Sequence, residues 1–176
     1  VLASAFEAAE RFPVLVTVGI LPTEPATGYG YIQRGEEMDQ VGGRPVCRVL
    51  RFVEKPDPVT AQGYLDSGDY YWNGGMFVWR VSTVEAAFTE HAPELRTSFV
   101  AMEKELADGA GLEETLATHF PGVVKISVDY AIMEKAGNVV TIPADFDWDD
   151  VGAWPAAARH MRSIGEGNVS RGRALV

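Results

Sequence analysis

The apolar and polar positions of this chain follow helical spacing in some segments and strand-like spacing in others. Leu2, Phe6 and Ala9 recur at helical intervals, and residues 14–20, VLVTVGI, are almost continuously apolar. A continuous apolar run of this length is typical of a strand buried on both faces of a largely parallel sheet. We therefore expect the chain to begin with a helix that is followed by a buried strand.

The remaining elements are predicted from the same two spacings. Residues 21–45 are rich in glycine, proline and charge, so we expect a loop with a short hairpin, strand-like only over residues 29–33 and turning at Gly42 and Gly43. Further strands are expected over residues 47–53, 70–81, 123–126 and 138–143. Helices are expected from Pro58 to near Gly68, from a capping box at Ser82 and Glu85, and over residues 95–106, 112–116, 130–135 and 152–161. This alternation predicts a three-layer α/β domain with a mixed, mostly parallel sheet that binds ligands at the carboxyl ends of its strands.

Composition narrows the class of protein. The chain has 176 residues, of which 47% are hydrophobic and 23% charged, enough for one domain with a sizeable core. A net charge of -10 argues against a nucleic-acid surface, because phosphate backbones require clustered lysine and arginine. No apolar run is long enough to span a membrane, and the single Cys47 fits a reducing compartment. We therefore expect a cytoplasmic protein that binds neither nucleic acid nor membranes.

Glu54, Lys55 and Pro56 end a predicted strand with two adjacent opposite charges. At a strand end both side chains can turn into a cleft, where a carboxylate accepts hydrogen bonds from sugar hydroxyls and an ammonium meets a phosphate. The residues alone favour a solvated strand terminus instead.

Asn73 lies beside Gly74 and Gly75 in the otherwise apolar segment WNGGMF. Glycine inside a strand often marks the close approach of a ligand or of another backbone, and an amide can both donate to and accept from a sugar hydroxyl. A β-bulge in which Asn73 caps a turn explains the pattern equally well.

The densest group of carboxylates comprises Asp145, Asp147, Asp149 and Asp150. An EF-hand loop would need glycine at the sixth position and glutamate at the twelfth, where this chain has Asp150 and Ala156. Magnesium is better suited, because it binds through one or two carboxylates together with substrate phosphates. A solvated loop is the interpretation for Asp145, Asp147 and Asp149.

The segment from Gly28 to Gly30 and the residue Asp129 could also contact a substrate. Gly28 and Gly30 allow the backbone around Tyr29 to approach a ligand. Asp129 precedes a predicted short helix and can cap it, or it can face a substrate.

Five short segments carry a resemblance to a known family: TGYGYI (27–32), FVEKP (52–56), WNGGMF (72–77), SVDYAIMEK (127–135) and WDDVGAW (148–154). In this order they resemble the C-terminal part of the catalytic domain of mannose-1-phosphate guanylyltransferases, and the likeness covers about residues 14–161. The resemblance implies a nucleotide-diphospho-sugar transferase-like fold. It also implies that GTP and mannose 1-phosphate are converted to GDP-mannose and pyrophosphate with Mg²⁺ as cofactor.

The resemblance also implies roles for individual residues. Catalytic roles fall to Lys55, which would contact the sugar phosphate, and to Asp150, which would bind Mg²⁺. The residues implied to bind substrate are Gly30, Glu54, Asn73 and Asp129. The family commonly has serine where this chain has Gly74 or Gly75, and this difference leaves Asn73 in place.

The family begins with a glycine-rich loop of the GxGTRxxPxS type, and the sequence contains no such loop. We therefore interpret residues 1–163 as the sugar-phosphate-binding part of a catalytic domain whose N-terminal nucleotide-binding half is absent. Residues 164–176 are interpreted as the start of a linker to a missing C-terminal region. The second Mg²⁺ carboxylate would lie in the absent half, so we expect this chain alone to be inactive. An exposed sheet edge would leave the formation of a homodimer open.

Two alternatives remain at this point. The chain could belong to a nucleotidyltransferase for another hexose 1-phosphate, which competition among nucleotides would reveal. It could instead be a non-catalytic sugar-phosphate-binding or regulatory module of the same fold.

Overall fold

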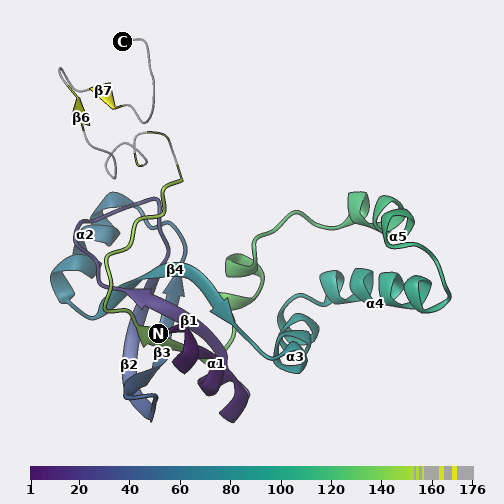
Figure 1. Ribbon diagram of the computed structural model, residues 1–176, viewed down its shortest axis with the longest axis horizontal. Coiled ribbons are helices and arrows are strands. Elements are labelled where there is room, and N and C mark those ends of the chain that lie inside the picture. The colour runs from purple at the N-terminus through teal and green to yellow at the C-terminus, as the bar shows by residue number, and fades with distance from the viewer. Residues whose placement is uncertain (153, 155, 157–162, 165–167, 170–176) are drawn as a thin grey trace. The chain divides into compact units, whose positions relative to one another are not determined.

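The computed structural model describes residues 1–152, 154, 156, 163–164 and 168–169 (Figure 1). The chain divides into two compact units, Val1–Asp145 and Phe146–Val176, and each is described here by itself. In the second unit the short strands β6 (Ser163–Ile164) and β7 (Asn168–Val169) pair antiparallel. The closing helix predicted over residues 152–161 lies largely outside the described residues.

The first unit contains helices and strands in alternation. In chain order they are α1 (Leu2–Arg11), β1 (Leu15–Ile20), β2 (Tyr31–Val41), β3 (Arg44–Val53), α2 (Pro58–Ser67), β4 (Tyr70–Val78), α3 (Val81–His91), α4 (Pro93–Ala107), α5 (Leu112–His119), the short helical turns η1 (Phe120–Gly122) and η2 (Asp129–Met133), and β5 (Val139–Pro143). No helix that the structure describes is both long and apolar enough to cross a membrane.

The strands of the first unit close into a barrel in the order β1-β4-β2-β3-β5. Strands β1 and β5 are parallel, whereas the other neighbours, β1 with β4, β4 with β2, β2 with β3 and β3 with β5, are antiparallel. The expected α/β class with a mixed sheet is confirmed. The expected parallel majority is wrong for this unit, in which β1–β5 is the one parallel pair and the β2–β3 hairpin joins two antiparallel neighbours directly.

The β2–β3 hairpin corrects a second expectation. Residues 31–41 form one long strand, whereas only residues 29–33 were expected to be strand-like, and Gly42 and Gly43 form the expected turn with φ of 57° and 75°. Both glycines adopt the left-handed conformation that a tight hairpin turn requires. Strand β2 is polar along much of its length, and many of its side chains are exposed. It is a strand nevertheless, because its backbone pairs with β3 whatever its side chains are.

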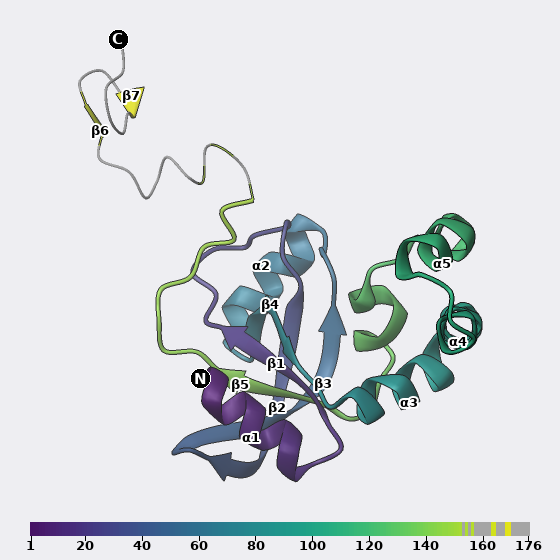
Figure 2. The same ribbon diagram turned by 45° about the vertical axis from the view of Figure 1, so that its right-hand side comes forward.

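Helices pack on both sides of the strands. Figure 2 shows α1 on one side of the strands and α3 to α5 on the other. Alanines of α1 pack with Val16, Val140 and Ile142, while Leu15 and Ile32 pack against α3, α4 and η2. All six residues of β1 are buried, which confirms the strand predicted from the apolar run. Strand β1 therefore contributes to both core clusters.

Local signals predicted α2 well and α3 less well. The Asp57 carboxylate accepts hydrogen bonds from the backbone N–H groups of Val59 and Thr60, both at 3.0 Å, and Gly68 ends α2 in the left-handed conformation. Hydrogen bonds from Thr60 lower the pKa of Asp57. The capping box expected at Ser82 is wrong, because the N-cap of α3 is Arg80, two residues earlier, and it makes no side-chain cap hydrogen bond.

The strand expected over residues 123–126 is also wrong. These residues form no strand, and Val124 and Ile126 are exposed. Apolar alternation predicts a strand only where a neighbouring strand can pair with the backbone, and none lies beside this segment in the first unit.

Candidate functional site

Strand β4 contains a bulge at its two glycines. Thr17 of β1 pairs with Phe77 and Gly19 pairs with Asn73, so two steps along β1 face four steps along β4. Gly75 adopts a left-handed φ of 66°. A Cβ at Gly74 would lie 3.1 Å from the Val18 carbonyl oxygen, so the backbone of β1 approaches closely here. Both the bulge and the close backbone approach predicted for this segment are present.

The side-chain amide of Asn73 is held by three partners from different parts of the chain. Its Oδ1 accepts hydrogen bonds from the Thr17 hydroxyl at 2.9 Å and from the backbone N–H of Gly75 at 3.2 Å. Its Nδ2 donates to Oδ1 of Asp129 at 3.2 Å. The Asn73 backbone N–H also donates to the Gly30 carbonyl oxygen at 2.7 Å. Strands β1 and β4, the loop at Gly30 and the helical turn η2 therefore meet at Asn73.

Glu54 follows directly after β3, and its side chain is only 9% exposed. Its Oε1 accepts a hydrogen bond from the ammonium of Lys55, whereas its Oε2 is buried and has no hydrogen-bond partner among the described residues. The backbone N–H of Glu54 donates to the Glu134 carboxylate at 2.9 Å. A buried carboxylate oxygen without a partner is costly, so its presence indicates a place for a donor from outside this part of the protein.

Gly30 leaves room for the Glu54 carboxylate. A Cβ at residue 30 would lie 2.5 Å from Oε2 of Glu54 and 3.2 Å from Cβ of Asn73. A Cβ at Gly28 would meet nothing within 4 Å. Of the two glycines in this segment, only Gly30 lies where a larger side chain would clash with its neighbours.

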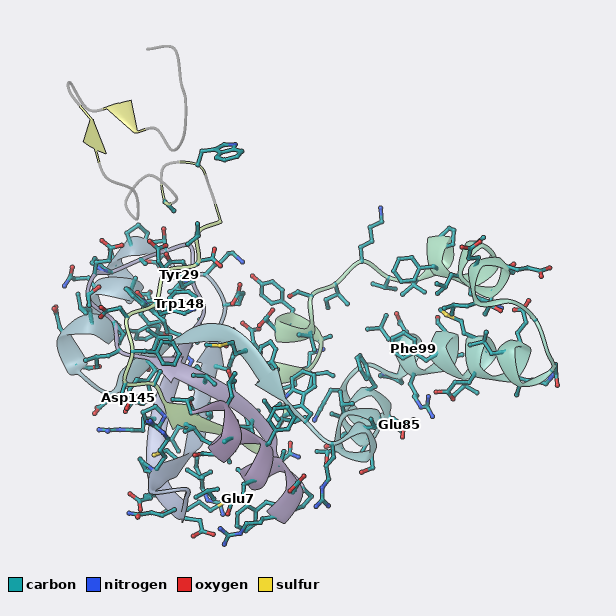
Figure 3. All side chains as sticks on the ribbon, in the orientation of Figure 1. Glu7, Tyr29, Glu85, Phe99, Asp145 and Trp148 are labelled. Atoms are coloured by element: carbon teal, nitrogen blue, oxygen red, sulfur yellow. The ribbon has the colours of Figure 1, made fainter. Side chains whose placement is uncertain are left out.

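Lys55 adopts an unusual backbone conformation beside Glu54. Its φ is 49°, which is uncommon for a residue other than glycine, and such positions cluster at functional sites. Its backbone N–H donates to the carbonyl of Tyr29, which lies at the end of the strands away from Glu7 of α1 (Figure 3). The hydrogen bond to Glu54 and the negative charges of Glu54 and Asp129 raise the pKa of Lys55. Its side chain is 57% exposed, so the ammonium is accessible to a ligand.

Asp129 begins the π-helical turn η2 but does not cap it, since the residue at the cap position is Val128 and no side chain bonds there. Its carboxylate instead holds Asn73. Of the two interpretations left open by the sequence, the local cap is therefore wrong.

Five of the predicted site residues thus come together, and we call Gly30, Glu54, Lys55, Asn73 and Asp129 the Asn73 cluster. The cluster is rich in carboxylates and has one ammonium, that of Lys55. Cavities of about 490, 250 and 520 Å³ elsewhere in the first unit are lined by none of these residues. The roles of the individual residues remain predictions.

Asp150, the sixth predicted residue, belongs to the second unit. In its neighbourhood the Asp149 carboxylate accepts the backbone N–H of Val151 at 3.1 Å, and Val151 has a φ of 46°. Asp145 belongs to the first unit and pairs with Arg44 at 2.9 Å, which lowers the pKa of its exposed carboxyl. Among the described residues no group of three or more His, Cys, Asp or Glu side chains could hold a metal ion. Asp150 is exposed and could supply one carboxylate to Mg²⁺, with further ligands needed from elsewhere, and its role as a ligand remains a prediction.

Sequence reasoning missed two residues that support the cluster. Thr17 is fully buried and bonds Asn73, and Glu134 bonds the backbone of Glu54. The signal for Thr17 was its hydroxyl within the aliphatic run VLVTVGI, because a buried hydroxyl needs a partner.

Two similar proteins carry the same name. The chain is 40% identical over 158 residues to a mannose-1-phosphate guanylyltransferase of Sinorhizobium fredii, covering 90% of this chain and 30% of that protein. It is 41% identical over 162 residues to an Escherichia coli protein of the same name, covering 92% and 34%. The chain therefore spans about a third of the length of these relatives.

A solved structure is similar as well. The crystal structure of a Thermus thermophilus protein described as a mannose-1-phosphate geranyltransferase matches with a TM-score of 0.72 and 40% identity, over 90% of this chain and 43% of that one. Residues 1–166 match the model of the family described as nucleotidyl transferase. The chain belongs to the nucleotidyl transferase family.

Proposed function

We propose that this chain forms the mannose 1-phosphate-binding part of a mannose-1-phosphate guanylyltransferase, which converts GTP and mannose 1-phosphate to GDP-mannose and pyrophosphate. The observation that carries the proposal is Oε2 of Glu54, which is buried beside Gly30 and has no hydrogen-bond partner among the described residues. The names of the relatives support the choice of mannose and guanine.

The chemistry of the Asn73 cluster suits a sugar. A carboxylate oxygen only accepts hydrogen bonds, so Oε2 of Glu54 needs a donor such as a sugar hydroxyl. The second N–H of Asn73 Nδ2 can donate to a hydroxyl oxygen in turn. Because Glu54 and Asp129 of the cluster and the neighbouring Glu134 are acidic, neutral hydroxyls fit beside them better than a phosphate does. The cluster therefore binds the ring of the substrate.

Lys55 binds the phosphate of the substrate. Its ammonium is tethered by Glu54 on one side and exposed on the other, so it can meet a phosphate oxygen as a positive point charge. Its pKa lies above the ordinary 10.5 of lysine, so this side chain is charged at neutral pH.

Nucleotidyl transfer requires positioning and neutralisation of charge more than a protein nucleophile. An oxygen of the sugar phosphate attacks the α-phosphate of the nucleotide in line, and pyrophosphate leaves. The Asn73 cluster would orient the sugar, and Lys55 would fix the attacking phosphate. We assign one Mg²⁺ ligand to Asp150. When bound, Mg²⁺ neutralises charge on the nucleotide phosphates.

The test is pyrophosphate release by the protein expressed from its full reading frame, given Mg²⁺, mannose 1-phosphate and each nucleoside triphosphate in turn. We expect turnover with GTP, and a loss of about a hundredfold or more in Asp150→Ala. Asp147→Ala is the matched control, because Asp147 is an exposed aspartate of the same group and is expected to leave turnover unchanged.

Other outcomes point to the alternatives. Turnover that prefers another triphosphate or another hexose 1-phosphate would replace GTP or mannose and keep the reaction class. A folded protein without turnover on any triphosphate would indicate a binding or regulatory module. The 176-residue chain by itself is expected not to release pyrophosphate, and measurable release by it would refute that expectation.

A further inference from the structure

The orientation of the Asn73 amide is determined by two partners whose hydrogen-bonding roles are fixed. The backbone N–H of Gly75 can only donate, so the atom facing it is Oδ1. The carboxylate oxygen of Asp129 accepts, so the atom facing it is Nδ2. The bulge matters here, because the left-handed φ of Gly75 belongs to the turn that brings its N–H back to Oδ1.

This orientation defines the task of Thr17. A threonine hydroxyl can donate or accept, but it faces Oδ1 of Asn73 at 2.9 Å and must therefore donate. Thr17 is fully buried in β1, so water cannot replace this donor. With Oδ1 held by two donors and one N–H of Nδ2 held by Asp129, the second N–H is the part of the amide left to meet a ligand.

We propose that Thr17 is a positioning residue for substrate binding, whose hydroxyl holds the Asn73 amide so that its second N–H faces a sugar hydroxyl. The inference rests on the proposed function for the identity of the ligand. Thr17 does not touch the substrate itself. Its effect is to add a second donor to Oδ1, which reinforces the orientation set by Gly75 and Asp129 against the alternative in which Oδ1 would face the ligand and could only accept.

Thr141 provides a contrast within the same sheet. It is the register partner of Thr17 on β5 and is also fully buried, yet its hydroxyl has no partner among the described residues. Replacing Thr141 by valine removes no hydrogen bond that the structure shows, whereas the same change at Thr17 leaves Asn73 Oδ1 with the Gly75 N–H alone. Thr141→Val is therefore the matched control for Thr17→Val.

The experiment measures binding and the state of Asn73 separately in the protein expressed from its full reading frame. Mannose 1-phosphate is titrated by calorimetry. The side-chain NH₂ signals of Asn73 are followed by NMR after ¹⁵N-asparagine labelling and are assigned by their loss in Asn73→Ala. We expect Thr17→Val to shift these signals and to weaken binding about three- to tenfold. Thr141→Val should leave both unchanged.

Thr17→Ser separates the hydroxyl from the packing of the methyl group. It keeps the donor and loses a buried methyl group, so it should lower the thermal midpoint while keeping the Asn73 signals and the affinity. If Thr17→Ser shifts the Asn73 signals and weakens binding as Thr17→Val does, the effect is one of packing and the proposal is overturned. The proposal is equally overturned if Thr17→Val binds mannose 1-phosphate as the unmodified protein does.

Failure of the proposed function has a different signature. The unmodified protein would then show no binding of mannose 1-phosphate, while the Asn73 signals would still report whether Thr17 holds the amide. Binding by the unmodified protein that Thr17→Val does not weaken refutes the role of Thr17 alone.

Discussion

The Asn73 cluster and the helical layer formed by α3, α4 and α5 differ in what each leaves unsatisfied. In the cluster, the group that has no hydrogen-bond partner in the described part of the chain is polar, namely the buried Oε2 of Glu54. In and beside the helical layer, Leu112, Phe120 and Val124 are 60%, 63% and 52% exposed. A cavity of about 520 Å³ lined by Phe99 and other apolar residues lies in the same region (Figure 3).

The difference shows why one region identifies its ligand and the other does not. A hydrogen bond is directional, so an orphaned carboxylate oxygen beside an oriented amide specifies a donor and an acceptor at defined places. Apolar contact is non-directional and depends only on the area removed from water. The cluster therefore predicts a chemical class of ligand, whereas the exposed apolar side chains predict none.

The largest expected effect tests whether the two regions are independent. Leu95 of α4 is 8% exposed and packs in the core cluster that includes Ile32. We expect Leu95→Ala to lower the free energy of unfolding by about 2–3 kcal/mol, the lower end for such changes, because Leu95 borders open cavities. Affinity for mannose 1-phosphate should stay within about twofold. Denaturant unfolding and calorimetry measure the two quantities.

Leu112→Ala is the control for that change, since Leu112 is largely exposed and its loss should change stability by less than about 0.5 kcal/mol. A folded Leu95→Ala protein that binds mannose 1-phosphate much more weakly would break the comparison. It would mean that the helical layer supports the cluster as well as the core.

Glu54→Gln tests the polar side of the comparison. Losing the carboxylate should weaken binding of mannose 1-phosphate about 10- to 100-fold, because hydrogen bonds to charged groups are the strong ones. Stability should not fall in parallel, because a buried charge with one unpartnered oxygen is removed. Calorimetry and the thermal midpoint give both values.

Glu36→Gln, at an exposed glutamate, makes the same change of charge away from the cluster and should leave binding unchanged. If Glu54→Gln lost stability and affinity together, the carboxylate would be a structural group of the fold and the sugar-binding interpretation would fail.

A smaller effect is expected at Gly30. The methyl group of Gly30→Ala would lie 2.5 Å from Oε2 of Glu54, so the carboxylate must move. We expect binding to weaken about tenfold and stability to fall by about 1–2 kcal/mol. Gly28→Ala is the matched control, because nothing lies within 4 Å of its added methyl group. Equal affinities of the two variants would show that the Glu54 carboxylate has room to move without cost.

The sequence predicted the parts of the fold that depend on local signals. The apolar run of β1, the Asp57 cap of α2 and the glycine turn after β2 all act within a few residues of their own position. Within β2 it predicted a strand only as far as residue 33, because the polar residues that follow are held by pairing with β3, and pairing partners are not visible in a local pattern.

The site divides in the same way. Resemblance to a family named Glu54, Lys55 and Asn73, since these residues fall in short recognisable segments. Thr17 was missed because its contact with Asn73 joins residues 56 positions apart and is made by a bulge whose register no local pattern reveals. The sequence could thus identify residues of the Asn73 cluster but not the hydrogen bonds that orient them.

The smallest expected effect concerns the one ammonium of the cluster. Because Glu54 raises the pKa of Lys55 above its ordinary 10.5, the folded state holds this proton more tightly than the unfolded state. The resulting stabilisation is complete below pH 10.5 and is lost as the pH rises through the folded pKa. Lys55 is largely exposed, so solvent screening limits the effect to roughly 0.2–0.5 kcal/mol.

The measurement is the difference in unfolding free energy between the unmodified protein and Lys55→Gln, from pH 9 to pH 11.5, since the difference removes other titrating groups. We expect this difference in unfolding free energy to be constant up to about pH 10.5 and to shrink above it. Any loss of affinity for mannose 1-phosphate should occur over the same pH range. A gap that narrowed below pH 10 would mean that Glu54 does not hold the Lys55 ammonium. The cluster would then lack the tethered cation that distinguishes it from an ordinary acidic surface.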